Sequence, residues 1–175
     1  MFIFIEMILY GLILITGNDL LKYLGIFICF LYGLYTHKRV TWVLVLVLIA
    51  DYCLLLNDYY MLGLFIFIVI QCCYHMILKG SLWFYIWFIF LVGGCLEAFA
   101  LCYMMMSIQN IITAYRKQHW LFLTCVLLGM CDIGVMLQFV LKVNIPWIWW
   151  FYLPSQILFI KKAPSNEDGT IVKED

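Results

Sequence analysis

Long apolar runs separated by short polar breaks dominate the order of residues in this chain. A helix that crosses a membrane needs about 20 apolar residues, within a range of about 17–25. The runs lack the strict alternation of a membrane β-barrel, so they predict helices. The polar breaks fall at 17–19, 37–39, 57–58, 79–80, 93–97, 116–119 and 142–146. They leave eight predicted segments, roughly 2–16, 19–36, 40–56, 59–78, 81–95, 97–115, 120–141 and 147–160.

Composition indicates which environment surrounds these apolar runs. The 175 residues are 67% apolar and 11% charged, whereas soluble domains have about 45–50% apolar and about 25% charged residues. So few charged side chains cannot cover the chain in water, and we expect an all-α integral membrane protein. Ten basic and ten acidic residues cancel, which argues against a nucleic-acid partner. Glu6 stands where a cleaved signal peptide has a basic residue, so the first run is expected to be a mature helix.

The basic residues provide a test of the number of helices. Short cytoplasmic loops of membrane proteins are enriched in Lys and Arg. Basic clusters occur at every second boundary, namely Lys38-Arg39, Lys79, Arg116-Lys117 and Lys161-Lys162. The boundaries between them carry Asn18-Asp19, Asn57-Asp58 and Glu97, with Lys22 and Lys142 as exceptions. This alternation predicts one bundle of eight transmembrane helices over 1–162 with both termini in the cytoplasm, followed by a polar, disordered tail over 163–175.

Cysteine and histidine residues do not suggest a metal site. The eight cysteines lie within apolar runs without the spacing of metal ligands or a disulfide framework, and we expect them to act as small apolar residues. His37 and His119 fall in predicted loops, and His75 lies one turn from Lys79, where we expect it at the membrane interface. No metal-ligand set is therefore predicted.

Polar side chains within the apolar runs are costly in lipid and usually face a bundle interior or a cavity. Asp51 precedes Asn57 by six residues and Asp132 precedes Lys142 by ten, which places these acids ~9 Å and ~15 Å below one boundary at 1.5 Å per residue. Gln71 and Gln156 enter from the same side and reach ~18 Å and ~14 Å. One layer of the bundle can hold all four, whereas Glu6 is expected to reach the interface.

Two acids at one depth have two interpretations. In a dry cavity they provide a proton donor and a negative charge. Asp and Gln side chains also hydrogen-bond between membrane helices simply to join them. The similar depth of Asp51 and Asp132 favours a reaction site. Ser107 and Ser155 have no evident base and are not predicted to be nucleophiles.

Three stretches of the chain carry a recognisable order of residues. They are Ala50–Leu56 followed by Tyr60–Gly63, Phe67, Gln71 and Tyr74; then Leu127–Val135; then Phe151–Leu158. Together, over about residues 40–160, they resemble the YhhN-like lysoplasmalogenase family of eight-helix membrane proteins. That family has an Asp in its third helix, Gly–Phe–His/Gln–Tyr in the fourth, Ser/Cys-Asp in the seventh and Tyr…Gln in the last. Gln71 stands where many members have His, and Cys131 where Ser often precedes the Asp.

The resemblance implies a hydrolase that cleaves the vinyl-ether bond of lysoplasmalogens to a fatty aldehyde and a glycerophospho-amine. This reaction needs an acid that protonates the alkene and a negative charge near the resulting cation. We expect Asp51 and Asp132 to divide these roles, without a metal or organic cofactor. A lysophospholipid would enter from membrane lipid, in a bacterial inner membrane. The candidate substrate-binding or orienting residues are Gln71, Tyr74, Tyr103, Asn110, Tyr152 and Gln156.

Two other classes of protein stay open. A transporter or lipid-binding protein could use the buried Asp residues as a proton or ligand relay, but no inverted repeat is evident and Pro154 is the only proline within the apolar runs. A structural subunit would tolerate replacement of both Asp51 and Asp132 with little loss beyond stability.

Overall fold

The computed structural model describes residues 1–57, 59–141 and 147–165, and within these ranges every regular element is a helix. The all-α fold expected from the sequence is therefore confirmed for this part of the chain. The elements are α1 (Phe2–Thr16), α2 (Asp19–Tyr35), α3 (Thr41–Asp51), the π-helical turn η1 (Tyr52–Leu56), α4 (Tyr60–Ile77), the 3₁₀ helix η2 (Leu82–Gly93), α5 (Leu96–Arg116), α6 (Phe122–Leu141) and α7 (Ile148–Lys162).

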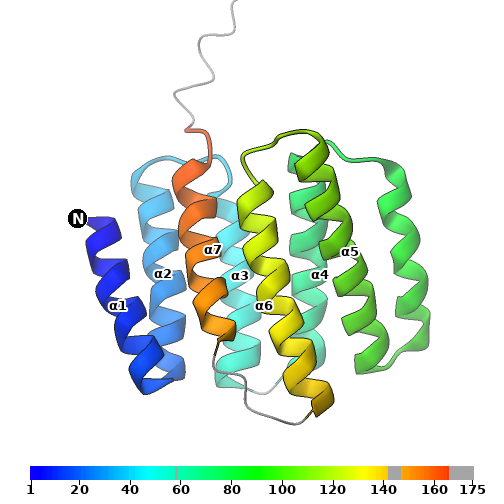
Figure 1. Ribbon diagram of the computed structural model, residues 1–175, viewed down its shortest axis with the longest axis horizontal. Helices are drawn as coiled ribbons and strands as arrows, with labels where there is room; N and C mark the ends of the chain where they lie inside the picture. The colour runs from blue at the N-terminus through cyan, green and yellow to red at the C-terminus, as the bar shows by residue number, and fades with distance from the viewer. Residues whose placement is uncertain (58, 142–146, 166–175) are drawn as a thin grey trace, which may run out of the picture.

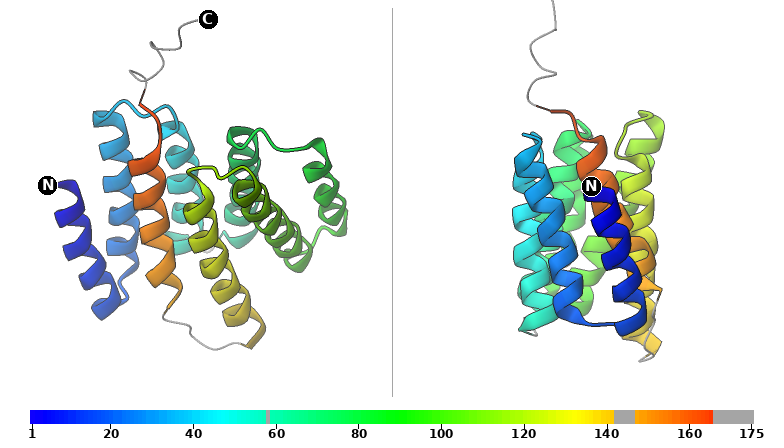
Figure 2. Two further views of the ribbon diagram at one scale, coloured as in Figure 1. Left: turned by 45° about the horizontal axis from the view of Figure 1, so that its top comes forward. Right: turned by 90° about the vertical axis from the view of Figure 1, so that its left-hand side faces the viewer.

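Successive helices run in opposite directions, with η1 continuing α3 (Figure 1). They stand in two layers, which Figure 2 shows from the side. In one layer α2, α3 and α4 are neighbours, and in the other α5, α6 and α7; contacts of α2 with α7 and of α4 with α5 join the layers. α1 and η2 stand at opposite edges of the bundle (Figure 1).

One end of the bundle carries the start of α1, the end of α7 and the loops 36–40, 78–81 and 117–121 (Figure 1). These segments contain the four basic clusters of the sequence, and we call this the basic end. The ammonium of Lys38 donates to the carbonyl of Ala163 at 2.6 Å, and the amide of Arg39 donates to the carbonyl of Pro164. The first residues of the expected tail thus pack on the loop 36–40, while 166–175 and the predicted breaks at 58 and 142–146 lie outside the described residues.

Apolar side chains cover much of the outer surface of the described helices. Phe4 is 71% exposed, Leu82 82% and Val92 87%. By contrast, several polar side chains within the bundle are at most 3% exposed, namely Glu6, Asp51, Gln71, His75, Asn110 and Gln156. Soluble proteins have the reverse distribution. The expectation that Glu6 and His75 lie at an interface is wrong, because both side chains are enclosed by neighbouring helices.

Among the described residues, two helices, α4 and α5, are long and apolar enough to cross a membrane. The other apolar segments are shorter, between 10 and 17 residues, and include α1, α3 with η1, η2 and the part of α6 up to Val135. Length and composition of these helices therefore indicate membrane association only weakly. The eight spanning helices that the sequence predicts stay a prediction.

A proline in α7 shows how the sequence joins two elements. Pro154 has no backbone N–H, so the carbonyl of Trp150, four residues earlier, loses its helical partner. The hydroxyl of Tyr10 in α1 donates to that carbonyl at 3.3 Å. The helical bond that Pro154 removes is thus replaced by a contact between α1 and α7.

The passage from α3 to α4 is tightly packed. The π-helical turn η1 begins directly after Asp51, and such turns occur often at functional sites. Gly63 of α4 lies against this turn: a Cβ there would come within 2.6 Å of the Leu54 side chain and 3.2 Å of the Ala50 carbonyl. Only glycine permits this approach, which holds the end of α3 at a fixed distance from α4.

Candidate functional site

Asp51 and Tyr152 form a buried pair between the two layers. Asp51 is the last residue of α3, and Tyr152 lies in α7. The Tyr152 hydroxyl lies 2.9 Å from Oδ1 and 2.8 Å from Oδ2 of Asp51. One hydroxyl proton is therefore shared between two carboxylate oxygens.

Asp132 of α6 has two donors from α5. The hydroxyl of Tyr103 donates to Oδ1 at 2.9 Å, and the hydroxyl of Ser107 donates to Oδ2 at 3.0 Å. Residues four apart lie on one face of a helix, so Tyr103 and Ser107 reach the same carboxylate. Tyr103 is among the residues proposed from the sequence. Ser107 was passed over because it has no base nearby in the sequence; its spacing from Tyr103 is the signal that identifies it.

The two carboxylate sites flank one aromatic side chain. The ring of Phe67 in α4 lies 6.0 Å from the ring of Tyr103 and 6.4 Å from that of Tyr152, edge to face in both cases. Cys131, which directly precedes Asp132 in α6, is itself buried. Four helices therefore bring two acids and two tyrosines into one region of the bundle.

Gln71 and Asn110 belong to a second polar cluster. The Asn110 side-chain amide donates to the Gln71 backbone carbonyl at 2.9 Å and to Gln71 Oε1 at 2.8 Å, while Asn110 Oδ1 lies 2.9 Å from Nδ1 of His75. Asn110 follows Ser107 on α5, so this cluster lies nearer the basic end than Asp132 does. Gln71 still approaches the Tyr103 hydroxyl. The four polar residues expected in one layer thus divide between two adjacent levels.

Tyr74 and Gln156 each have a buried polar atom without a hydrogen-bond partner among the described residues. The Tyr74 hydroxyl and Gln156 Oε1 are buried and make no hydrogen bond within the described chain. The two groups lie near one another but miss hydrogen-bond geometry. Buried polar atoms of this kind usually contact water or a ligand. No hydrogen bond joins either residue to Asp51 or Asp132 in this part of the chain.

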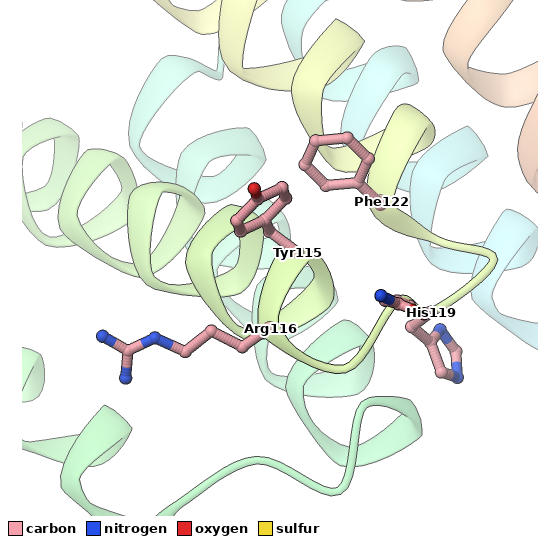
Figure 3. A pocket seen from close by; sticks show the side chains of 5 residues that line it. Tyr115, Arg116, His119 and Phe122 are labelled. Atoms are coloured by element: carbon pink, nitrogen blue, oxygen red, sulfur yellow. The ribbon is translucent and has the colours of Figure 1, made fainter.

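Two hollows in the surface lie away from the acids. One, of about 510 Å³, is lined by Tyr59, Tyr60, Met61, Leu62 and Leu96. The other, of about 440 Å³, is lined by Tyr115, Arg116, Gln118, His119 and Phe122 at the basic end. Figure 3 shows its Tyr115 and Phe122 rings facing each other while the Arg116 and His119 side chains point apart. These charged groups do not converge on one ligand position, so the hollow does not resemble an active site.

The described residues include no group of three His, Cys, Asp or Glu side chains that could hold a metal ion.

Comparisons with protein-family models, with curated proteins and with solved structures find no match to this chain. The arrangement around Phe67 is one that acid–base chemistry can use, because two carboxyl groups near this ring are held separately, each by its own tyrosine hydroxyl.

Proposed function

We propose that this chain is an eight-helix membrane protein that hydrolyses the vinyl-ether bond of a lysophospholipid, as lysoplasmalogenases do. The observation that carries the proposal is the pair of carboxyl groups on either side of Phe67, Asp51 buried and Asp132 partly buried, each of which accepts a tyrosine hydroxyl. A bundle that only needs interhelical contacts has no use for two acids at one place, since amides join helices at lower cost.

The location in a membrane is supported by the distribution of side chains. The outside of the helices is apolar while acids and amides lie inside. The basic clusters gather at one end of the bundle, which is where the cytoplasmic side would be. We therefore propose that both termini lie in the cytoplasm.

The hydrogen bonds suggest different roles for the two acids. Asp132 accepts from two hydroxyl groups on separate oxygens, an arrangement that stabilises a carboxylate anion. Asp51 shares a single donor. We therefore assign the proton donor to Asp51 and the stabilising anion to Asp132.

The reaction then proceeds in three balanced steps. The Asp51 carboxyl donates its proton to the β carbon of the vinyl ether, leaving an oxocarbenium ion opposite the Asp132 carboxylate. Water adds to the α carbon and gives its proton back to Asp51. The hemiacetal so formed breaks into a fatty aldehyde and the free hydroxyl of the glycerophospho-amine. The unpartnered atoms of Tyr74 and Gln156 are suited to orient water or the glycerol part.

The test measures aldehyde release by the detergent-purified protein from alkenyl lysophospholipids with ethanolamine and choline head groups. The parent is expected to release aldehyde, and Asp51→Asn and Asp132→Asn are each expected to lose most of this activity. Asp19→Asn is the matched control, since the Asp19 side chain is exposed and paired with Lys22. Full activity of both folded Asn variants would exclude this mechanism.

A proton relay is the second candidate, and one observation favours it. His75, Asn110 and Gln71 continue the polar interior from Tyr103 toward the basic end. A relay would predict pH-gradient-driven proton flux in proteoliposomes that Asp132→Asn abolishes, with no aldehyde release by the parent protein.

A further inference from the structure

The side chain of His75 is enclosed by three segments near the basic end. It lies in the last turn of α4 and is 2% exposed. Its ring stacks on Phe84 of η2, with centroids 3.8 Å apart and planes 9° from parallel. Gly80 also lies against the ring, since a Cβ there would come within 1.9 to 2.6 Å of ring atoms. The position is thus shaped around an imidazole.

Both ring nitrogens of His75 face oxygen atoms that only accept hydrogen bonds. Nε2 lies 2.9 Å from the backbone carbonyl of Ser81, and Nδ1 lies 2.9 Å from Oδ1 of Asn110. The orientation of Asn110 is settled by its other contact. Its nitrogen faces the backbone carbonyl of Gln71, and a reversed amide would set two acceptors against each other. Only an imidazole that carries both protons satisfies both contacts.

The surroundings suit a positive charge on this ring. The C-terminal end of α4 presents the negative pole of the helix dipole, and the face of Phe84 attracts a cation. The titratable neighbours are Tyr85 of η2, whose ring lies edge-on at 6.3 Å, and Lys117, directly after α5, whose ammonium donates to the carbonyls of Leu78 and Lys79. Lys22–Asp19 is the one ion pair within the described residues, so carbonyl groups and not a carboxylate meet the charge of His75.

We propose that the ring of His75, when it carries two protons, joins the loop 78–81 and η2 to α4 and α5 through its two hydrogen bonds. The doubly protonated ring bonds Ser81 and Asn110 together, and a neutral ring keeps only one of the two as a donor. Loss of one ring proton therefore breaks either the contact with Ser81 or the contact with Asn110 and leaves the other in place. This inference requires no hydrolytic activity and goes beyond the proposed function.

The experiment follows ring and backbone together in detergent micelles. Protein labelled with ¹⁵N-histidine gives the protonation state of each ring, and hydrogen exchange gives protection factors for the amides of 82–93. We expect the His75 ring to carry two protons whenever 82–93 is protected, and both signals to change together as pH rises. Protection of 82–93 that stays constant while the ring loses a proton would overturn the proposal.

Three variants distinguish this role of the His75 ring from a general effect on the stability of the protein. His75→Gln is expected to lower the protection of 82–93 at acidic pH and to remove its pH dependence. His37→Gln, at an exposed position, is the matched control and should behave as the parent. Gly80→Ala displaces the ring and should lower protection at every pH. If His75→Gln does not fold, the test rests on the parent protein alone, in which ring protonation and amide protection of 82–93 are followed together.

Discussion

The Tyr152 hydroxyl lies 2.9 Å and 2.8 Å from the two carboxylate oxygens of Asp51, although 101 positions separate the residues in the sequence. This contact joins α3 to α7 across the two layers. A buried polar group that loses its partner retains its full cost of desolvation. The pair therefore contributes to the stability of the bundle whatever reaction the site supports.

Replacing Tyr152 with Phe should lower the free energy of unfolding by ~1–3 kcal/mol, because Asp51 then lacks its donor. The apolar ring and its contact with Phe67 remain, so packing is kept. Thermal unfolding in detergent measures the change. Tyr35→Phe is the control, since Tyr35 is 84% exposed and its replacement should leave stability unchanged. A neutral effect of Tyr152→Phe would show that the pair adds nothing.

Tyr103→Phe and Ser107→Ala should not have additive effects on stability. Both residues donate to Asp132, so each single replacement removes one of two bonds and the double replacement leaves the carboxylate bare. Groups that share a partner typically couple by ~0.5–3 kcal/mol. A double-mutant cycle measured by chemical unfolding provides the number. Simple additivity would mean that the two hydroxyls act independently of Asp132.

Two glycine positions should respond to alanine with opposite signs. At Gly63 a Cβ meets the Leu54 side chain and the Ala50 carbonyl, so Gly63→Ala should destabilise by ~1–3 kcal/mol. At Gly11, in the middle of α1, a Cβ has nothing within 4 Å, and Gly11→Ala should stabilise by ~0.5–1 kcal/mol. Unfolding midpoints of the two variants, measured side by side, test both. Equal effects would contradict the close approach of α4 to η1.

The apolar runs predicted the helices well, because the spacing of polar breaks is a local property of the sequence. All described helices begin and end within a few residues of the predicted bounds. The apolar faces extend around these helices, so the sequence does not indicate which way each helix is turned. For that reason the pairing of Asp51 with Tyr152 could not be predicted, nor could the burial of Glu6 and His75.

Depth estimates were similarly limited. Counting 1.5 Å per residue predicted one layer for Gln71 and the two acids, but the estimate ignores the tilt of each helix and the π-helical turn η1 after Asp51. In the structure, the cluster of Gln71 and Asn110 lies about one helical turn from the carboxylate sites. This distance follows from the spacing of Ser107 and Asn110 on α5. The proposed roles of Tyr74 and Gln156 stay predictions, because their free atoms make no contact that assigns them a partner.

The proposed eight-helix membrane topology predicts where a thiol reagent can react. All eight cysteines lie in the described ranges, and Cys95 alone is exposed, at the end opposite the basic end. A membrane-impermeant maleimide should label the parent from outside intact cells and should not label Cys95→Ser. In the Cys95→Ser background, His37→Cys should react only after the membrane is permeabilised. Labelling of both positions from the same side would exclude this topology.

His119 should make the protein less stable as pH falls. Partial burial and the nearby Lys117 ammonium lower the pKa of His119 below its ordinary value of 6.5, so the folded state favours the neutral ring. The unfolded chain takes up a proton more readily, and stability is lost as pH falls through about 6.5 and below. The ring's Nδ1 accepts the amide of Leu121 at 3.3 Å, which also requires a neutral ring.

The measurement for His119 compares melting temperatures of the parent and His119→Gln between neutral and mildly acidic pH. The glutamine can still accept the Leu121 amide but does not titrate. We expect the parent to lose more stability on acidification than the variant does. An identical decline of both proteins would show that His119 is not the group responsible.

The winding of η2 has a consequence for the lipid beside it. Its 12 residues, at about 2.0 Å each, extend about 24 Å, where an α-helix of that length would extend only about 18 Å. A hydrocarbon core is about 30 Å thick. In the membrane protein that we propose, η2 stands at the edge of the bundle and is still shorter than the bilayer it would cross. A bilayer that thins along this edge would match the length of η2, and such a match favours thin membranes.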